Sequence, residues 1–222
     1  MASDDFIPLT ALERDALGKL SNIAMARAAS SLRQMVQHQV LLSVPAVEVL
    51  TQEAAAGIVT RPERPSLVAV RQDFSGAFSG RALLIFPEAN SLELVRAVVG
   101  PKLTLEDIVD LEDEALAETG NIILNSWVAT IANLLKRALR MSLPVVVRGD
   151  GRQMFDSPGR PDSLILFLHI NFEISNKPIS GYVALLMDIP SFAELRALIA
   201  DFVSNVTQSD LTQRDGAGER SR

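Results

Sequence analysis

The sequence predicts a mixed α/β fold of the α+β type, in which a duplicated unit folds as one pseudo-two-fold domain. Two long helices and several accessory helices are expected to pack on a strand-rich core. The order of long helix, strands and short helix occurs twice, and two landmarks repeat with it: Asn-Ile at 22–23 and 121–122, and Ser-x-Pro at 43–45 and 142–144. Both offsets are 99 residues (121 minus 22, and 144 minus 45), and equal spacing at separated landmarks indicates duplication.

The first long helix is predicted to begin near Thr10, because Thr10 and Glu13 have the spacing of a capping box. It is expected to reach Gln37, since apolar residues recur with helical period along it. These periodic residues are Leu12, Ala16, Leu20, Ile23, Ala24, Ala28, Leu32 and Val36.

The rest of repeat one is predicted to be strands followed by a short helix. Residues 41–50 are extended, and Pro45 limits this segment to a sheet edge or an irregular start. Strand-like runs at 66–74 and 80–87 are expected to form a hairpin. A helix over 91–100 follows and is ended by a Gly-Pro pair.

Repeat two follows the same plan. A long helix is predicted from about residue 104 to residue 140, followed by an extended segment at 141–149. Strands are expected at 163–174 and 181–190. Ser-x-x-Glu at 191–194 has capping-box spacing and predicts the start of another helix.

The predicted domain spans residues 10–204, with repeat one at about 10–100 and repeat two at about 104–204. Residues 1–9 are expected to be a flexible N-terminus and residues 205–222 a disordered tail, because both ends are polar.

Composition excludes several classes of function. The formal net charge is -6, which disfavours nucleic acids and anionic membranes as partners. The absence of cysteine excludes disulfides, thiolate catalysis and Cys-based zinc sites. No signal peptide and no apolar run long enough to insert in a membrane is visible in the sequence, so a cytoplasmic protein is expected.

Three polar residues are expected to share one face of the second long helix, because they are spaced by four and by three positions. They are Glu114, Glu118 and Asn121. The first long helix repeats this spacing with Asp15, Lys19 and Asn22. In both repeats, 22 residues separate the asparagine from a proline.

This doubled motif resembles the CheC family of chemotaxis phosphatases, which includes CheX and the phosphatase part of FliY. The resemblance covers about residues 10–203 and includes the blocks at 80–100 and 180–195. It implies hydrolysis of the aspartyl phosphate of CheY-like response regulators, with Glu118 and Asn121 as catalytic residues. The phosphorylated receiver would bring its own Mg²⁺ and lysine, so no cofactor and no metal site of this chain's own is expected.

The chemistry agrees with that implication. Phosphoryl transfer depends mostly on positioning and electrostatics, so aiming one water at the scissile bond is sufficient. The Asn121 amide can accept from the water with its oxygen while donating elsewhere. Glu118 can pair with the receiver's lysine, and Glu114 is expected to help dock the partner. Gly120 either lets the receiver backbone approach or serves helix packing.

The first motif departs from the family pattern and is expected to be a degenerate site. Lys19 stands where the family has glutamate, and a lysine facing the receiver's lysine has the wrong sign for docking. Asn22 is then expected to be structural. In the second motif, Glu114 occupies a position that is usually Asp or Ser in the family.

The main alternative is a non-catalytic adaptor that binds a phosphorylated receiver or a CheD-like receptor deamidase. A structural protein with two decayed sites is a third hypothesis, disfavoured by the intact second motif. His38 and His169 have no partner at catalytic spacing, so core or surface roles are expected for them. Trp127 is expected to face the core, away from the motif.

Overall fold

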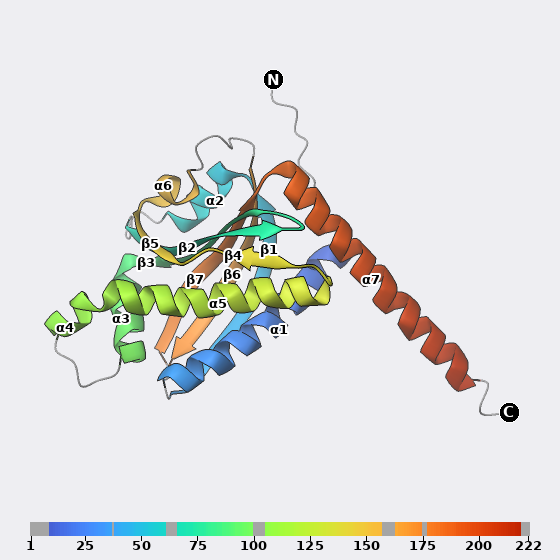
Figure 1. The fold of residues 1–222 in the computed structure, drawn as a ribbon, viewed down its shortest axis with the longest axis horizontal. Helices are drawn as coiled ribbons and strands as arrows, with labels where there is room; N and C mark the ends of the chain where they lie inside the picture. The colour runs from blue at the N-terminus through green and yellow to red at the C-terminus, as the bar shows by residue number, and fades with distance from the viewer. Residues whose placement is uncertain are drawn as a thin grey trace, which may run out of the picture.

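The structure, a computed structural model, describes residues 9–36, 38–60, 66–99, 105–156, 163–174 and 177–218. Within these residues, one seven-stranded antiparallel sheet carries helices on both of its faces (Figure 1). The expected mixed α/β architecture is therefore confirmed.

The elements of repeat one follow the predicted order, with one helix added after the first strand. They are α1 (Ala11–Val36), β1 (Val40–Leu50), α2 (Gln52–Val59), β2 (Leu67–Gly76), β3 (Gly80–Pro87) and α3 (Glu88–Val99). The Thr10–Glu13 capping box is present, since Thr10 N donates to Glu13 Oε2 at 2.7 Å and Glu13 N donates to Thr10 Oγ1 at 3.2 Å. The predicted hairpin is confirmed as β2 and β3. The helix expected from residue 91 begins earlier, at Glu88, and the Gly-Pro pair expected to end it lies outside the described residues.

Repeat two contains eight described elements. They are α4 (Leu105–Asp110), α5 (Glu112–Leu134), β4 (Leu139–Met141), β5 (Val145–Gly149), α6 (Gly151–Phe155), β6 (Leu164–Ile174), β7 (Lys177–Met187) and α7 (Ile189–Gly218). The helices α2 and α6 were not predicted because they are short. Each carries a side-chain N-cap, Thr51 for α2 and Asp150 for α6, and that is the signal that could have revealed them.

The single helix predicted over 104–140 is wrong. It is divided at Leu111 into α4 and α5, and α5 ends at Leu134. Lys136 adopts a left-handed φ of 53°, and Arg137 N donates to Ala132 O at 2.8 Å, which closes the helix end. Glycine is the usual residue at a left-handed position that ends a helix. Because a lysine stands there, the sequence did not indicate the end of α5.

The start of α7 also differs from the prediction. Asp188, rather than Ser191, caps this helix, since Ser191 N donates to Asp188 Oδ1 at 2.8 Å. The Ser191 hydroxyl instead accepts from Ser79 N at 3.2 Å. The helix continues to Gly218, away from the sheet (Figure 1). Extending a helix costs far less than starting one, which explains how it continues through polar sequence.

The strand order reveals the duplication. The sheet runs β1-β6-β7-β3-β2, and both β4 and β5 pair with β2. β1 of repeat one therefore pairs with β6 of repeat two, and β4 and β5, which together correspond to β1, pair with β2 of repeat one. Pro45 leaves β1 on the edge of the sheet, as predicted. At the centre, Leu83 of β3 pairs with Ala184 of β7. This exchange makes the two repeats one pseudo-symmetric sheet.

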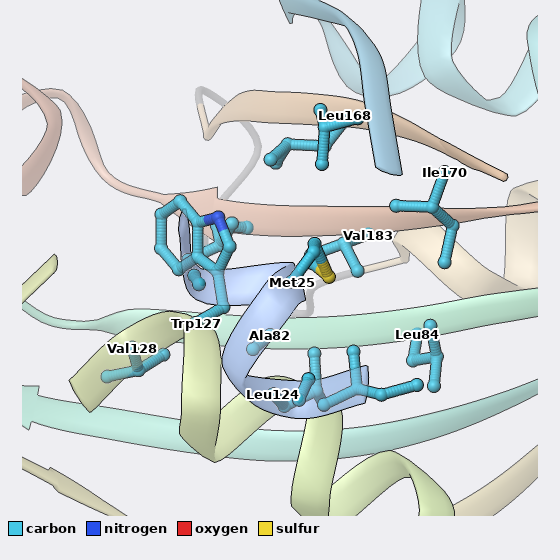
Figure 2. Close-up of a cluster of buried hydrophobic side chains, with 14 of the residues drawn as sticks. Met25, Ala82, Leu84, Leu124, Trp127, Val128, Leu168, Ile170 and Val183 are labelled. Atoms are coloured by element: carbon cyan, nitrogen blue, oxygen red, sulfur yellow. The ribbon is translucent and has the colours of Figure 1, made fainter. Parts of the chain in front are cut away.

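Two hydrophobic cores lie on opposite faces of the sheet. The larger core lies beneath α1 and α5, and the smaller lies beneath α2 and α6. Figure 2 shows Trp127 with Met25, Leu124 and strand residues in the larger core. Its indole nitrogen donates to Ser21 Oγ at 3.0 Å, so the expected core position of Trp127 is confirmed. Two of the periodic residues in α1, Leu12 and Ile23, are instead exposed to 60% and 46%.

A partly buried ion pair joins the start of α1 to α7. Arg196 Nε lies 2.9 Å from Glu13 Oε1. Burial alone raises the pKa of the Glu13 carboxyl, but hydrogen bonds from Thr10 and the Arg196 charge outweigh it, so the pKa lies below its ordinary value. Among the described helices, none combines the length and apolar character that a membrane crossing requires.

Candidate functional site

An arginine on the neighbouring strand β5 fixes the start of α5. Arg148 Nη2 lies 2.7 Å from Asp113 Oδ1 and 3.2 Å from Glu112 Oε2. The hydrogen bond to Asp113 raises the pKa of the Arg148 guanidinium above its ordinary value. Part of the acidic run at the start of this helix therefore neutralises Arg148, and the face that follows is held in a defined orientation.

Glu114 and Glu118 lie on the exposed side of α5. In the described part of the chain, neither carboxylate forms an ion pair or a hydrogen bond. Glu118 therefore presents an uncompensated negative charge one helical turn before Asn121. Such a charge is available to a cation on another molecule.

Asn121 is half-buried, and its side-chain oxygen accepts two hydrogen bonds. Gln72 Nε2, from β2, donates to Asn121 Oδ1 at 3.1 Å. Asn125 Nδ2, one turn further along α5, donates to the same oxygen. In the unbound protein both lone pairs of this oxygen are therefore occupied by side-chain donors. The Asn121 Nδ2 group has no partner among the described residues.

Gly120 serves helix packing, so the alternative of a docking role is not supported. Gly120 is buried, and a Cβ built on it would clash with the side-chain carbons of Val70 in β2. The missing side chain allows α5 to approach the sheet closely beside Asn121. The sequence could not separate these two roles because it does not show which side of the helix faces the sheet.

The corresponding residues of repeat one form a different arrangement. Lys19 Nζ lies 2.8 Å from Asp15 Oδ2, so the lysine charge is paired within α1. Asn22 bonds to the backbone of β1 with both halves of its amide. Nδ2 donates to Val44 O at 3.1 Å, and Val44 N donates to Oδ1 at 3.0 Å. We call this pair of hydrogen bonds the Asn22–Val44 latch.

A groove of about 610 Å³ accompanies this first motif. Asp15, Lys19 and Asn22 line it from α1, and Pro45 and Glu48 line it from β1. His169 Nε2 lies 3.0 Å from Glu48 Oε1, and the histidine ring packs edge-on against Phe167. The histidine thus contacts a residue that lines the groove without lining it itself, in keeping with the expected core or surface role.

Three residues of the second motif were missed by the sequence analysis: Gln72, Asn125 and Ser142. A signal for Gln72 exists, because it follows Val68 and Val70 on the inward face of β2 and precedes Phe74 there. A buried polar side chain is normally hydrogen-bonded, so a glutamine at an otherwise apolar set of positions predicts a polar partner nearby. Among the described residues, no cluster of three His, Cys, Asp or Glu side chains could hold a metal ion.

Fold and site together define a duplicated α+β domain that displays a glutamate and an asparagine, three positions apart, on one helix face. No protein-family model matches the sequence. The chain is 22% identical over 193 residues to the CheY-P phosphatase CheC of Bacillus subtilis. The aligned region covers 82% of this chain and 91% of CheC.

A second relative and two solved structures extend the comparison. The chain is 22% identical over 140 residues to the flagellar motor switch phosphatase FliY of Bacillus subtilis, covering 62% of this chain but 36% of that protein. The crystal structure of Thermotoga maritima FliY has a TM-score of 0.70 at 19% identity, covering 89% of this chain and 98% of that chain. The FliM middle domain of H. pylori has a TM-score of 0.56 at 9% identity, covering 86% and 99%. The resemblance to the CheC, CheX and FliY family is confirmed, and the fold is shared with FliM.

Proposed function

We propose that this protein hydrolyses the aspartyl phosphate of a CheY-like response regulator. The single observation that carries the proposal is the intact pair on α5: an exposed Glu118 that is unpaired among the described residues, and a half-buried Asn121 one turn away. The similarity to CheC over most of both chains supports the same chemistry. The partner is a phosphorylated receiver that carries its own Mg²⁺, and the reaction takes place in the cytoplasm.

Glu118 docks the receiver. Its carboxylate pairs with the receiver's lysine beside the phosphorylated aspartate, and a charge-assisted hydrogen bond there fixes the register of α5 on the partner. Because Glu118 has no partner within its own described chain, docking does not first have to break an internal ion pair.

Asn121 aims the attacking water. A carbonyl oxygen has two lone pairs, and in the unbound protein Gln72 and Asn125 occupy both. When the receiver docks, the Asn125 amide turns aside and a water takes its position on Oδ1. The water then donates a hydrogen bond to Asn121 Oδ1 and directs a lone pair at phosphorus, in line with the scissile bond. Asn121 does this without titrating, so the water is held in the same way at every physiological pH.

The test is release of inorganic phosphate from a phosphorylated CheY-like protein. The rate should rise when this protein is added, and Asn121→Ala should lower that acceleration about a hundredfold because the water is no longer positioned. Asn133→Ala is the matched control, since Asn133 is an exposed asparagine near the other end of α5. Full activity in Asn121→Ala would refute the proposal.

A non-catalytic adaptor is the second candidate. Two observations favour this candidate. The fold is shared with the FliM middle domain, and the first motif has Lys19 where the family has glutamate. Such an adaptor would bind a phosphorylated receiver, or a CheD-like deamidase, without changing the lifetime of the phosphate. Measuring binding and phosphate lifetime on the same samples separates the two candidates.

A further inference from the structure

Gln72 is a buried polar side chain whose amide group is only partly satisfied. The residue is 1% exposed on β2, and its Oε1 has no hydrogen-bond partner among the residues that the structure describes. Its Nε2 donates to Asn121 Oδ1 at 3.1 Å and to Ser142 O at 2.8 Å. Leaving a buried acceptor without a partner costs about 1–3 kcal/mol, so the position is poorly explained by stability alone.

The hydrogen bonds of Gln72 fix its orientation. The Ser142 backbone carbonyl can only accept, so the Gln72 NH₂ group must face it, and its second N–H then points to Asn121 Oδ1. Exchanging its nitrogen and oxygen would bring three oxygens together. Gln72 therefore requires that Asn121 presents its oxygen toward the sheet.

The duplication supplies a natural comparison, because the residue equivalent to Gln72 in repeat one is not polar. Leu42 of β1 pairs with Phe172 of β6. Met141 of β4, which is the repeat-two equivalent of Leu42, pairs with Phe74 of β2. Positions on β2 therefore correspond to positions on β6 at an offset of 98 residues (172 minus 74). The same offset brings Gln72 to Ile170, which is 2% exposed in the larger core.

Without a glutamine, the asparagine of repeat one forms the Asn22–Val44 latch. Both halves of its amide are then consumed by backbone, and Val44 is 5% exposed. In repeat two the residue equivalent to Val44 is Leu143 (143 minus 44 is 99), and it is 85% exposed. The two halves thus differ at three linked positions. Gln72 stands where repeat one has Ile170, Asn121 is not latched whereas Asn22 is, and Leu143 is an exposed residue between two strands whereas Val44 is a buried residue within β1.

We propose that Gln72 is a positioning residue that keeps Asn121 out of a latch like the one formed by Asn22. It does so by holding the Asn121 oxygen with one N–H and the Ser142 carbonyl with the other, which blocks direct pairing of Asn121 with the backbone at Leu143. The expected effect of Gln72 on kcat rests on the proposed function. Its expected effect on the hydrogen bonds of Asn121 does not.

The kinetic test uses Gln72→Met, which keeps the length of the side chain and removes its donors. The kcat for phosphate release should fall about tenfold to a hundredfold, because small misplacements of a positioning group are costly. The KM should stay within about twofold, since Glu118 still docks the receiver. An unchanged kcat, or a loss confined to KM, would overturn the proposal.

The matched control is Gln153→Met. Gln153 is another glutamine whose side chain is hydrogen-bonded to backbone, since its Oε1 accepts from Asp150 N in the capping box of α6, near the opposite face of the sheet. It should lower the melting temperature without changing kcat. If Gln153→Met lowered kcat as much as Gln72→Met does, the effect of Gln72 would be general destabilisation and the inference would fail.

The structural test is independent of activity. In a crystal structure of Gln72→Met, or by NMR of the Asn121 side-chain amide, we expect Asn121 to bond to the backbone of Leu143. An Asn121 side chain that keeps its wild-type position would overturn the inference, even if the wild-type protein proved to have no phosphatase activity. If Gln72→Met does not fold, Gln72→Ile serves instead, because isoleucine already occupies the equivalent position in repeat one.

Discussion

At the scale of single residues, Asn22 and Asn121 show how one side chain can serve two purposes. Both lie on long helices at equivalent positions. Asn22 ties α1 to the backbone of β1, whereas the Asn121 side chain bonds, within the described part of the chain, only to the side chains of Gln72 and Asn125. An asparagine whose amide is fully consumed by backbone stabilises the fold but cannot hold a water. The environment of each asparagine, rather than its presence, therefore distinguishes the two motifs.

This difference predicts that restoring the glutamate of the first motif will not restore a second site. Lys19→Glu, made in an Asn121→Ala background, should leave phosphate release at the Asn121→Ala level because the latch still holds Asn22. The measurement is the phosphate-release rate of the double variant against the single variants.

Lys19→Glu alone is the control for this experiment. It should keep wild-type phosphate release, since Asn121 is untouched. It should also lose a few tenths of a kcal/mol of stability, because the ion pair with Asp15 would be replaced by two carboxylates one helical turn apart. Activity of the double variant clearly above that of Asn121→Ala would show that the latch opens and that the first motif can act.

At the scale of elements, the position of Asn121 depends on how closely α5 approaches β2. Gly120 allows the contact with Val70, and the hydrogen bond from Gln72 crosses the same interface. The ion pairs of Arg148 fix the N-terminal end of the helix. The exposed motif is thus held by packing on the buried side of the same helix.

Gly120→Ala tests this interface. A new Cβ would displace Val70 or α5, so the free energy of unfolding should fall by about 1–3 kcal/mol, as expected for overpacking. Phosphate release should fall as well, because Asn121 moves with the helix. Urea unfolding and the phosphate-release assay measure the two effects.

Gly57→Ala is the matched control for a glycine in a helix. A Cβ at Gly57 in α2 would meet nothing within 4 Å. The substitution should therefore stabilise the protein by about 0.5–1 kcal/mol through helix propensity and leave phosphate release unchanged. A stabilising Gly120→Ala would mean that the α5–β2 contact is looser than the structure indicates.

At the scale of the whole molecule, the two repeats are interlocked. Because β1 pairs with β6, and β2 pairs with β4 and β5, neither repeat can complete its part of the sheet alone. The partly buried Glu13–Arg196 ion pair and the Trp127–Ser21 hydrogen bond also join the two repeats. The chain should therefore unfold as one unit.

Equilibrium unfolding in urea tests this expectation. Trp127 is the single tryptophan and reports on the packing of α5 against α1, while far-UV circular dichroism reports on all elements. Both signals should give the same midpoint, as a two-state transition requires. Two separate midpoints would show that the repeats unfold independently.

The sequence by itself determined the duplication, the Thr10–Glu13 cap, the β2–β3 hairpin and the common face of Glu118 and Asn121. These features follow from spacing, period and local hydrogen bonding, which the order of residues specifies directly. Only the tertiary structure decided the rest. It ended α5 at a left-handed Lys136, turned Gly120 toward Val70, and paired Gln72 with an asparagine 49 positions away. Such contacts depend on which strands and helices meet in space, so two motifs of equal spacing acquired an asparagine bonded to side chains in one repeat and an asparagine bonded to backbone in the other.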